Sequence, residues 1–227
     1  MPKDDNDIGS GNSERLGVPA SASEERRRYL QLEDFDALFE LGRELEANDR
    51  REEAEACWHP IAEVHAGGAL GMAWIALQSG DDEEELHWTT RAAELGSVGS
   101  MHSLGRMLSK AGNEAEAESW WLKAADQGNS DSMCSLAFFY KRSGRLDKHK
   151  LWLQRAGNAR HPFAMFALGI RAENSEDLHA ARDWLELSWE SGYELAGRHL
   201  MRIAHKQGDS AYLQQLATKI SASRPNE

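Results

Sequence analysis

Apolar residues recur at helical spacing along most of the chain, and short polar stretches interrupt them at regular intervals. Met101, Leu104 and Leu108 are three and four residues apart, which places them in one apolar stripe on a helix. Gly112 and Asn113 follow this stripe and end the helix. The next apolar residues predict a second helix and are Ala117, Trp120, Trp121, Ala124 and Ala125. The pattern therefore predicts a helix hairpin, whose two helices we call helix A and helix B.

The hairpin repeats along the chain with a period of 32 residues. At this interval Trp88 recurs as Trp120, Trp152 and Trp184, and Leu104 recurs as Leu136, Leu168 and Leu200. Because a single hairpin cannot bury its own apolar face, the units must stack. The sequence predicts an all-α fold, a right-handed αα-solenoid of about six helix-turn-helix repeats, with the tryptophans in its core. The repeats are predicted to begin near Asp36, Gly67, Val98, Ser130, Pro162 and Glu194.

The two ends of the chain lack this pattern. Residues 1–28 are predicted to form a disordered N-terminal lead, because they are rich in Ser, Gly, Asp and Asn and end in the basic run from Arg26 to Arg28. Residues 29–220 form the predicted solenoid, and residues 221–227 a flexible C-terminal tail. Within the solenoid, Pro60 lies inside a predicted helix B, where it should remove one backbone hydrogen bond and kink the helix.

One set of residues in the hairpin resembles a known repeat family. The set is similar to the Sel-one-like repeat, a branch of the tetratricopeptide-type αα-solenoids, and consists of Leu104-Gly105, Ala117, Trp120, Ala124-Ala125 and Gly128. The resemblance extends from about Asp34 to Ile220 and implies an adaptor that binds other proteins, of bacterial origin. Four units depart from the pattern. In unit one Trp58 lies only 30 residues before Trp88, so the register slips, and unit two has Ala73-Trp74 in place of the Leu-Gly pair. Unit four has Arg160 in place of the terminal glycine, and unit six has Met201 and Leu216 at repeat positions, as expected of a terminal unit.

The composition narrows the classes of partner and the compartment. A formal net charge of −12 argues against a general nucleic-acid binder and against binding to anionic membranes, since both need a basic surface. The two cysteines, Cys57 and Cys134, are too few for a disulfide framework. No export signal or membrane-spanning stretch is expected from the sequence. We therefore expect a cytoplasmic protein.

The sequence contains no recognisable motif for catalysis, metal binding or cofactor binding. Its nine histidines form no HExxH pattern, its cysteines form no CxxC, and no glycine-rich phosphate loop follows a strand. His102 and Cys134 occupy equivalent positions in adjacent A helices, but a metal site would need further ligands. We expect no enzyme activity, no cofactor and no metal, and an enzyme with a non-obvious site is the alternative.

The residues of helix A that point away from its apolar stripe are the candidate partner-binding surface, since A helices usually line the concave face of such solenoids. The positions two before and two after the repeated leucine are His102, Cys134, Phe166 and Arg198, and Arg106, Phe138, Ile170 and Arg202. One helical turn further along are Lys110, Lys141 and Arg142. The charges in this set are basic, whereas the acidic residues are concentrated in the loops and B helices.

This separation of charge predicts a concave groove that binds another protein, such as an acidic peptide or helix with apolar anchors. Two other interpretations remain. The apolar residues Phe138, Phe166 and Ile170 can be ordinary packing residues between helices, with the basic residues as solvated charges. Alternatively, the chain is a self-assembling structural subunit, and its oligomeric state is open.

Overall fold

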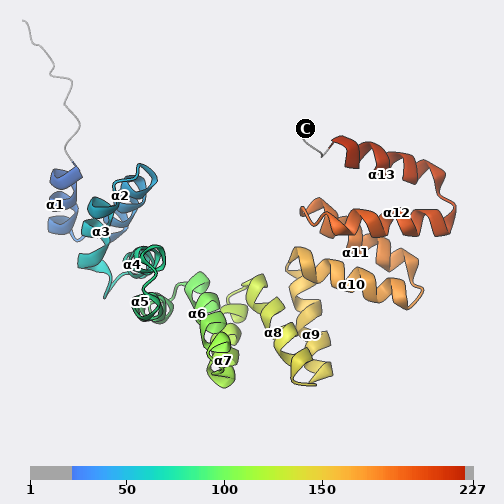
Figure 1. Ribbon diagram of the computed structural model, residues 1–227, viewed down its shortest axis with the longest axis horizontal. Coiled ribbons are helices and arrows are strands. Elements are labelled where there is room, and N and C mark those ends of the chain that lie inside the picture. The colour runs from blue at the N-terminus through green and yellow to red at the C-terminus, as the bar shows by residue number, and fades with distance from the viewer. Residues whose placement is uncertain (1–21, 223–227) are drawn as a thin grey trace, which may run out of the picture.

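The computed structural model describes residues 22–222, and this part of the chain is helical throughout, without strands (Figure 1). It contains thirteen α-helices and one short 3-10 helix. The α-helices are α1 (Ala22–Leu32), α2 (Phe35–Ala47), α3 (Arg51–Trp58), α4 (Ala66–Ser79), α5 (Asp82–Glu94), α6 (Val98–Lys110), α7 (Glu114–Asp126), α8 (Ser130–Arg142), α9 (Leu146–Asn158), α10 (Pro162–Asn174), α11 (Leu178–Glu190), α12 (Leu195–Gln207) and α13 (Ser210–Ala222).

Six antiparallel helix pairs follow α1, and they are arranged one after another along an arc (Figure 1). In each pair the A helix packs on its own B helix, and the B helix packs on the A helix of the next pair. The A helices are α2, α4, α6, α8, α10 and α12, and each begins within one residue of a predicted repeat start. The predicted all-α solenoid of about six helix-turn-helix repeats is therefore confirmed.

Each loop between α-helices, except the connection from α3 to α4, contains one residue in the left-handed backbone conformation. From Gly80 to Gly208 such a residue occurs every 16 residues, at the turns from A to B and from B to A alike. Glycine occupies all of these positions except two, where Arg160 has a φ of 61° and Glu176 a φ of 63°. The left-handed conformation costs a residue with a Cβ about 1–2 kcal/mol. Arg160 thus adopts the backbone of the glycine that it replaces.

The A helices of the central repeats begin at residues that cap them. The side chains of Ser97, Asn129 and His161 accept hydrogen bonds from the backbone N–H groups of Ser100, Ser132 and Ala164. These caps are one period apart and satisfy amides that have no partner within the helix. The starts of α6, α8 and α10 are therefore fixed by local chemistry, which keeps the exposed faces of these helices in register.

A tryptophan of helix B packs directly on a glycine of helix A. Trp121 is buried, and its indole N–H donates to the backbone oxygen of His102 at 3.3 Å. A Cβ on Gly105 would lie 2.5 Å from Nε1 of Trp121, so a side chain here would displace the ring. Trp58 packs on Gly42 in the same way. The close approach of helices A and B that the Leu-Gly pair predicts is thus present in the structure.

The ends of the solenoid differ from the predicted boundaries. Helix α1 begins at Ala22, so residues 22–28 are helical rather than part of a disordered lead. This helix packs on α2, and Tyr29 and Leu30 lie against the core there, which accounts for the earlier start. Helix α13 continues to Ala222, two residues into the predicted tail. The remaining residues of the predicted lead and tail, 1–21 and 223–227, lie outside the described residues.

Pro60 interrupts helix B of the first repeat, as the sequence predicts. Helix α3 ends at Trp58, and the chain continues as a 3-10 helix over His59–Ile61. The proline ring excludes the amide hydrogen bond that a continuous α-helix would need at this position. The first repeat is therefore shorter than the others, which explains why its register differs from the 32-residue period.

The prediction that the tryptophans are core residues is wrong for Trp74, whose surface is 45% exposed. The buried pair of unit two that matches Leu104-Gly105 is Met72-Ala73, and not Ala73-Trp74. Trp74 comes one position later, on the outward face of α4, and its indole N–H donates to Oε1 of Glu46 at 3.0 Å. Partly buried tryptophans are Trp88, Trp120, Trp184 and Trp189.

Candidate partner-binding surface

Successive A helices place corresponding residues on one face of the solenoid. Two series at the 32-residue period lie one helical turn apart on helices α4 to α12. The first is Leu70, His102, Cys134, Phe166 and Arg198, and the second is Trp74, Arg106, Phe138, Ile170 and Arg202. We call the solvent-exposed members of both series, with Lys110 and Lys141 one turn later, the A-helix surface.

A groove between α8, α9 and α10 lies on the A-helix surface. Its volume is about 460 Å³, within the range of roughly 300–1,000 Å³ that is common for binding pockets. The groove includes four of the predicted binding residues, namely Phe138, Lys141, Phe166 and Ile170. The other residues of this α8–α10 groove are Ala137, His149, Leu153, Phe163, Ala167, Arg171, Asn174 and Ser175.

Aromatic rings form the floor of the groove. The ring centroids of Phe138 and Phe163 are 5.2 Å apart, and those of Phe163 and Phe166 are 6.4 Å apart. Tyr193 extends the cluster, with its ring centroid 4.9 Å from that of Phe166. Phe138 is 48% exposed although it contacts Phe163, so the cluster leaves apolar surface open to solvent. Neither Phe163 nor Tyr193 is among the residues that the sequence selects.

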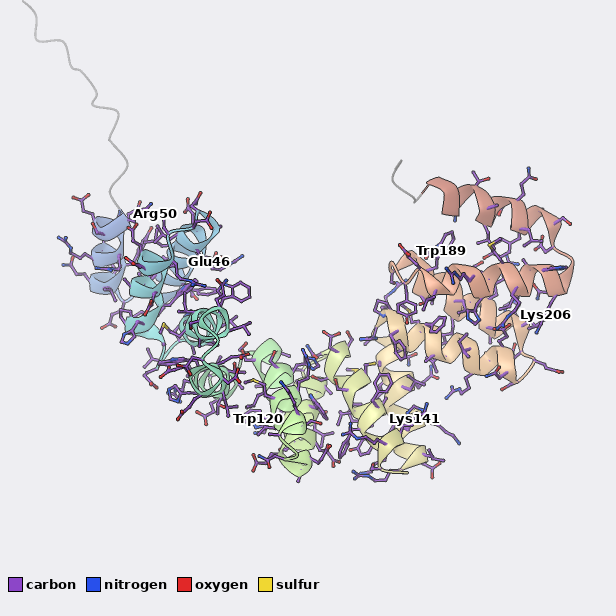
Figure 2. All side chains as sticks on the ribbon, in the orientation of Figure 1. Glu46, Arg50, Trp120, Lys141, Trp189 and Lys206 are labelled. Carbon is purple, nitrogen blue, oxygen red and sulfur yellow. The ribbon has the colours of Figure 1, made fainter. Side chains whose placement is uncertain are left out.

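Two cations at the edge of the groove are free to bind an acidic group. Lys141 and Arg171 line the groove and are exposed, and Figure 2 labels Lys141 at the C-terminal end of α8. Neither side chain forms an ion pair with any residue of the described chain. Three further predicted residues are also exposed and form no ion pair within the described residues, namely Arg106, Lys110 and Arg198. Such side chains lose no existing ion pair when a carboxylate approaches.

Arg202 is engaged within the chain. Its guanidinium donates through Nε and Nη2 to the two carboxylate oxygens of Glu173, at 2.9 and 2.6 Å. His199 is 3.1 Å from the same carboxylate, and Lys206 is 4.0 Å from it. Burial opposes ionisation of Glu173, but the hydrogen bonds from Arg202 and His199 outweigh it and lower its pKa. This cluster joins α10 to α12, so a partner carboxylate at Arg202 would compete with Glu173.

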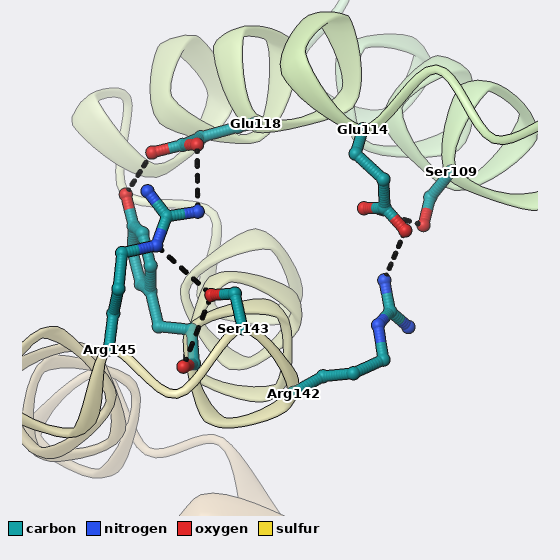
Figure 3. Close-up of polar contacts among 7 residues, drawn as sticks. Ser109, Glu114, Glu118, Arg142, Ser143 and Arg145 are labelled. Carbon is teal, nitrogen blue, oxygen red and sulfur yellow. Dashed lines mark hydrogen bonds and ion pairs between the residues drawn. The ribbon is translucent and has the colours of Figure 1, made fainter.

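Arg142 lies outside the groove and connects two repeats. Its Nη2 is 2.5 Å from Oε1 of Glu114 on α7 (Figure 3). Beside it, Arg145 pairs with Glu118 at 3.4 Å, and the Tyr140 hydroxyl donates to the same carboxylate (Figure 3). These contacts hold α8 against α7. Although the sequence places Arg142 with Lys141, the two side chains have different roles in the structure.

His102 and Cys134 are placed between repeats rather than on the surface. Nδ1 of His102 is 3.1 Å from Oγ of Ser132, and burial lowers the pKa of the ring. Cys134 is only 5% exposed, and burial raises the pKa of its thiol to about 11. A buried, protonated thiol is a weak nucleophile. Within the described residues no group of three or more His, Cys, Asp or Glu side chains is placed to hold a metal ion.

Helix length and polarity bear on the question of membrane insertion. Among the described helices, none has the length and apolar character that crossing a bilayer requires. The longest A helix of the solenoid, α4, has fourteen residues.

No protein-family model matches the chain, and no curated protein matches it by sequence. Solved structures do resemble it. A Sel1 repeat protein from Oxalobacter formigenes is 21% identical, with a TM-score of 0.58 over 83% of this chain and 60% of that protein. A protective antigen of uropathogenic Escherichia coli strains, described as having an SLR fold, is 20% identical, with a TM-score of 0.65 over 81% of this chain and 44% of that protein.

A third similar structure is YrrB, described as a TPR protein with an unusual peptide-binding site. It is 15% identical, with a TM-score of 0.51 over 79% of this chain and 97% of that protein. The chain spans less than two thirds of the length of the two Sel1-type proteins. At these identities the likeness establishes the fold, and the chain has the fold of the Sel1-like and tetratricopeptide-type helical-repeat proteins.

Proposed function

We propose that this chain is a protein-interaction scaffold whose α8–α10 groove binds an acidic segment of a partner through an apolar anchor side chain. The observation that carries the proposal is the exposed ring of Phe138, set in an aromatic floor beside the unpaired cations Lys141 and Arg171. Aromatic floors with a charged edge are a common arrangement for binding a peptide side chain and its neighbouring carboxylates.

The charge distribution supports an acidic partner. The protein has a formal net charge of −12, so a general attraction to acids is not expected from the whole molecule. On the A helices α6 and α8, however, the only acidic residue is Asp131, which pairs with His161 at 3.3 Å. A local basic face on an acidic protein favours acidic partners and disfavours basic ones. The peptide-binding site named for YrrB, a protein of the same fold, also supports a peptide ligand.

Fluorescence anisotropy with a labelled synthetic peptide tests this function. The one-anchor peptide has a single phenylalanine among glutamate and serine residues, and its control has lysine in place of glutamate. We expect the acidic peptide to bind and the basic peptide to bind at least about tenfold more weakly, since a like-charged approach costs several kcal/mol. Raising the salt concentration should weaken the acidic complex because the cations at the edge are exposed.

Matched variants locate the binding site. Phe138→Ser should weaken binding about tenfold, as expected for loss of an aromatic anchor at an interface. Leu151→Ser is the control, because Leu151 is 52% exposed on α9 and does not line the groove. Lys141→Glu tests the contribution of the positive charge at the edge of the groove. Lys150→Glu is its control, because Lys150 does not line the groove. Equal affinities for Phe138→Ser, Leu151→Ser and the wild type would refute the proposed function.

A further inference from the structure

Helix α4 carries a second apolar surface that the core does not use. Leu70, Trp74 and Leu77 are between 45% and 51% exposed and are spaced by four and three residues, so they share one face of the helix. The helix has no charged residue in its sequence. The indole N–H of Trp74 is already bound by Glu46, which fixes the ring while it stays exposed. We call these three residues the α4 stripe.

The α4 stripe and the α8–α10 groove occupy the same face of the repeats. Trp74 precedes Arg106 by one 32-residue period and Phe138 by two. Leu70 precedes Phe166, which lines the groove, by three periods. Because the A helices keep this register, the exposed side chains of α4 continue the A-helix surface. Helix α4 lies on the N-terminal side of α6 along the arc (Figure 1).

Helix α6 separates the two apolar surfaces, and its exposed face is cationic. Arg106 and Lys110 are exposed and form no ion pair within the described part of the chain. The sequence of α6 contains no acidic residue. The A-helix surface is therefore apolar on α4, basic on α6 and apolar again on α8 and α10. A partner that contacts all three helices must have the complementary order.

We propose that the α4 stripe is a second anchor site for the same partner segment, whose acidic middle lies over Arg106 and Lys110. This inference rests on the proposed function of the α8–α10 groove. Successive A helices each pack on the B helix between them, at about 8–10 Å per contact, so two steps along the arc cover at least roughly 20 Å. An extended chain needs about six residues to cross roughly 20 Å. The segment therefore has two apolar side chains separated by at least about six mostly acidic residues.

A second copy of this chain is a less suitable occupant than an acidic segment. Two copies that paired through the same face would bring Arg106 and Lys110 of each copy toward those of the other. Like charges placed against each other at an interface cost free energy. Binding of one linked segment at both sites has the opposite effect, because the first anchor raises the effective concentration of the second.

The test extends the anisotropy experiment with a two-anchor peptide, made as a series in which two phenylalanines are separated by about six to about ten glutamate and serine residues. We expect this peptide to bind wild-type protein at least about tenfold more tightly than the one-anchor peptide. Trp74→Ser should reduce the affinity of the two-anchor peptide to that of the one-anchor peptide. Leu151→Ser is the matched control and should leave both affinities unchanged.

The outcomes separate this inference from the proposed function. If Phe138→Ser weakens binding of the two-anchor peptide but Trp74→Ser does not, the proposed second anchor site on α4 is refuted. The proposed function of the α8–α10 groove is then retained. If neither substitution weakens binding, both proposals fail. Light scattering provides a further check: a dimer that Trp74→Ser dissociates would assign the α4 stripe to a second copy and overturn the inference. Replacing Arg106 and Lys110 together by serine should reduce the salt dependence of two-anchor binding more than that of one-anchor binding.

Discussion

Gly105→Ala tests whether the contact between helices A and B has the tightness that the structure implies. Alanine favours a helix over glycine by up to about 1 kcal/mol, so propensity alone predicts stabilisation. The new Cβ, however, would lie 2.5 Å from Nε1 and 2.6 Å from Cδ1 of Trp121. Trp121 is buried on a closely packed helix pair and has little room to move. Overpacking of this kind costs about 1–3 kcal/mol and also endangers the hydrogen bond from Trp121 to His102.

The packing cost exceeds the gain in propensity, so we expect a net loss of about 1–2 kcal/mol in the free energy of unfolding. For a chain of this size that loss lowers the thermal midpoint by about 2–8 °C. Gly99→Ala is the matched control, because Gly99 is in the same helix and an added Cβ there meets no atom within 4 Å. That substitution should leave the midpoint unchanged or raise it.

The double variant Gly105→Ala with Trp121→Leu checks the cause of the loss. It reproduces the pair Ala137 and Leu153, which occupies the same positions one period later and is buried. We expect the double variant to be more stable than the sum of the two single effects, since the alanine then meets a smaller side chain. Thermal and urea unfolding followed by circular dichroism measure the wild type, the two single variants, the double variant and the control Gly99→Ala. If Gly105→Ala stabilises the chain as much as Gly99→Ala does, the close contact is not real.

Three further predictions follow from the backbone and the buried titratable groups. Arg160→Gly should raise the free energy of unfolding by about 0.5–1 kcal/mol in a urea titration, because it removes the left-handed strain at φ 61°; a decrease would contradict this reasoning. Cys57 and Cys134 should resist a thiol reagent at neutral pH until the chain unfolds, since burial raises the pKa of each thiol to about 11; rapid modification of native protein would contradict this. Burial lowers the pKa of His102 and His161 below 6.5, so their contribution to stability is complete above that pH and falls as pH decreases through the folded pKa. The thermal midpoint should therefore decrease in mild acid, and His102→Asn should reduce that dependence.

Much of the fold could be predicted because its determinants are local and periodic. Glycines such as Gly112 and Gly128 mark the turns, and the spacing of Leu104 and its equivalents defines the A helices. The predicted repeat starts consequently agree with the structure to within one residue. The errors occur at the N-terminal end and in the second repeat. Helix α1 begins at Ala22, within the predicted lead, because it packs on α2 outside the repeat pattern. In the second repeat the sequence indicates Ala73-Trp74 as the Leu-Gly equivalent, one residue too late, which hides the exposure of Trp74.

The candidate site could be predicted only in part, because it depends on contacts between repeats. Phe138 and Ile170 follow from the period, and the structure places both in one groove. Phe163 lies near the start of α10, outside the positions that the repeat selects, although it completes the aromatic floor. The pairing of Arg202 with the buried Glu173 depends on how closely α10 approaches α12, which no local pattern reveals. Sequence periodicity identifies the face of the helix but not which of its charges remain free.

The most direct test of binding at the A-helix surface is site-specific photo-crosslinking to the two-anchor acidic peptide. A benzophenone amino acid is introduced in place of Phe138 on α8 or, as the control, in place of Leu151 on α9; both positions are exposed. We expect a crosslinked product from position 138 that excess unlabelled peptide removes, and no such product from position 151. Crosslinking from position 151 alone would contradict binding at the A-helix surface.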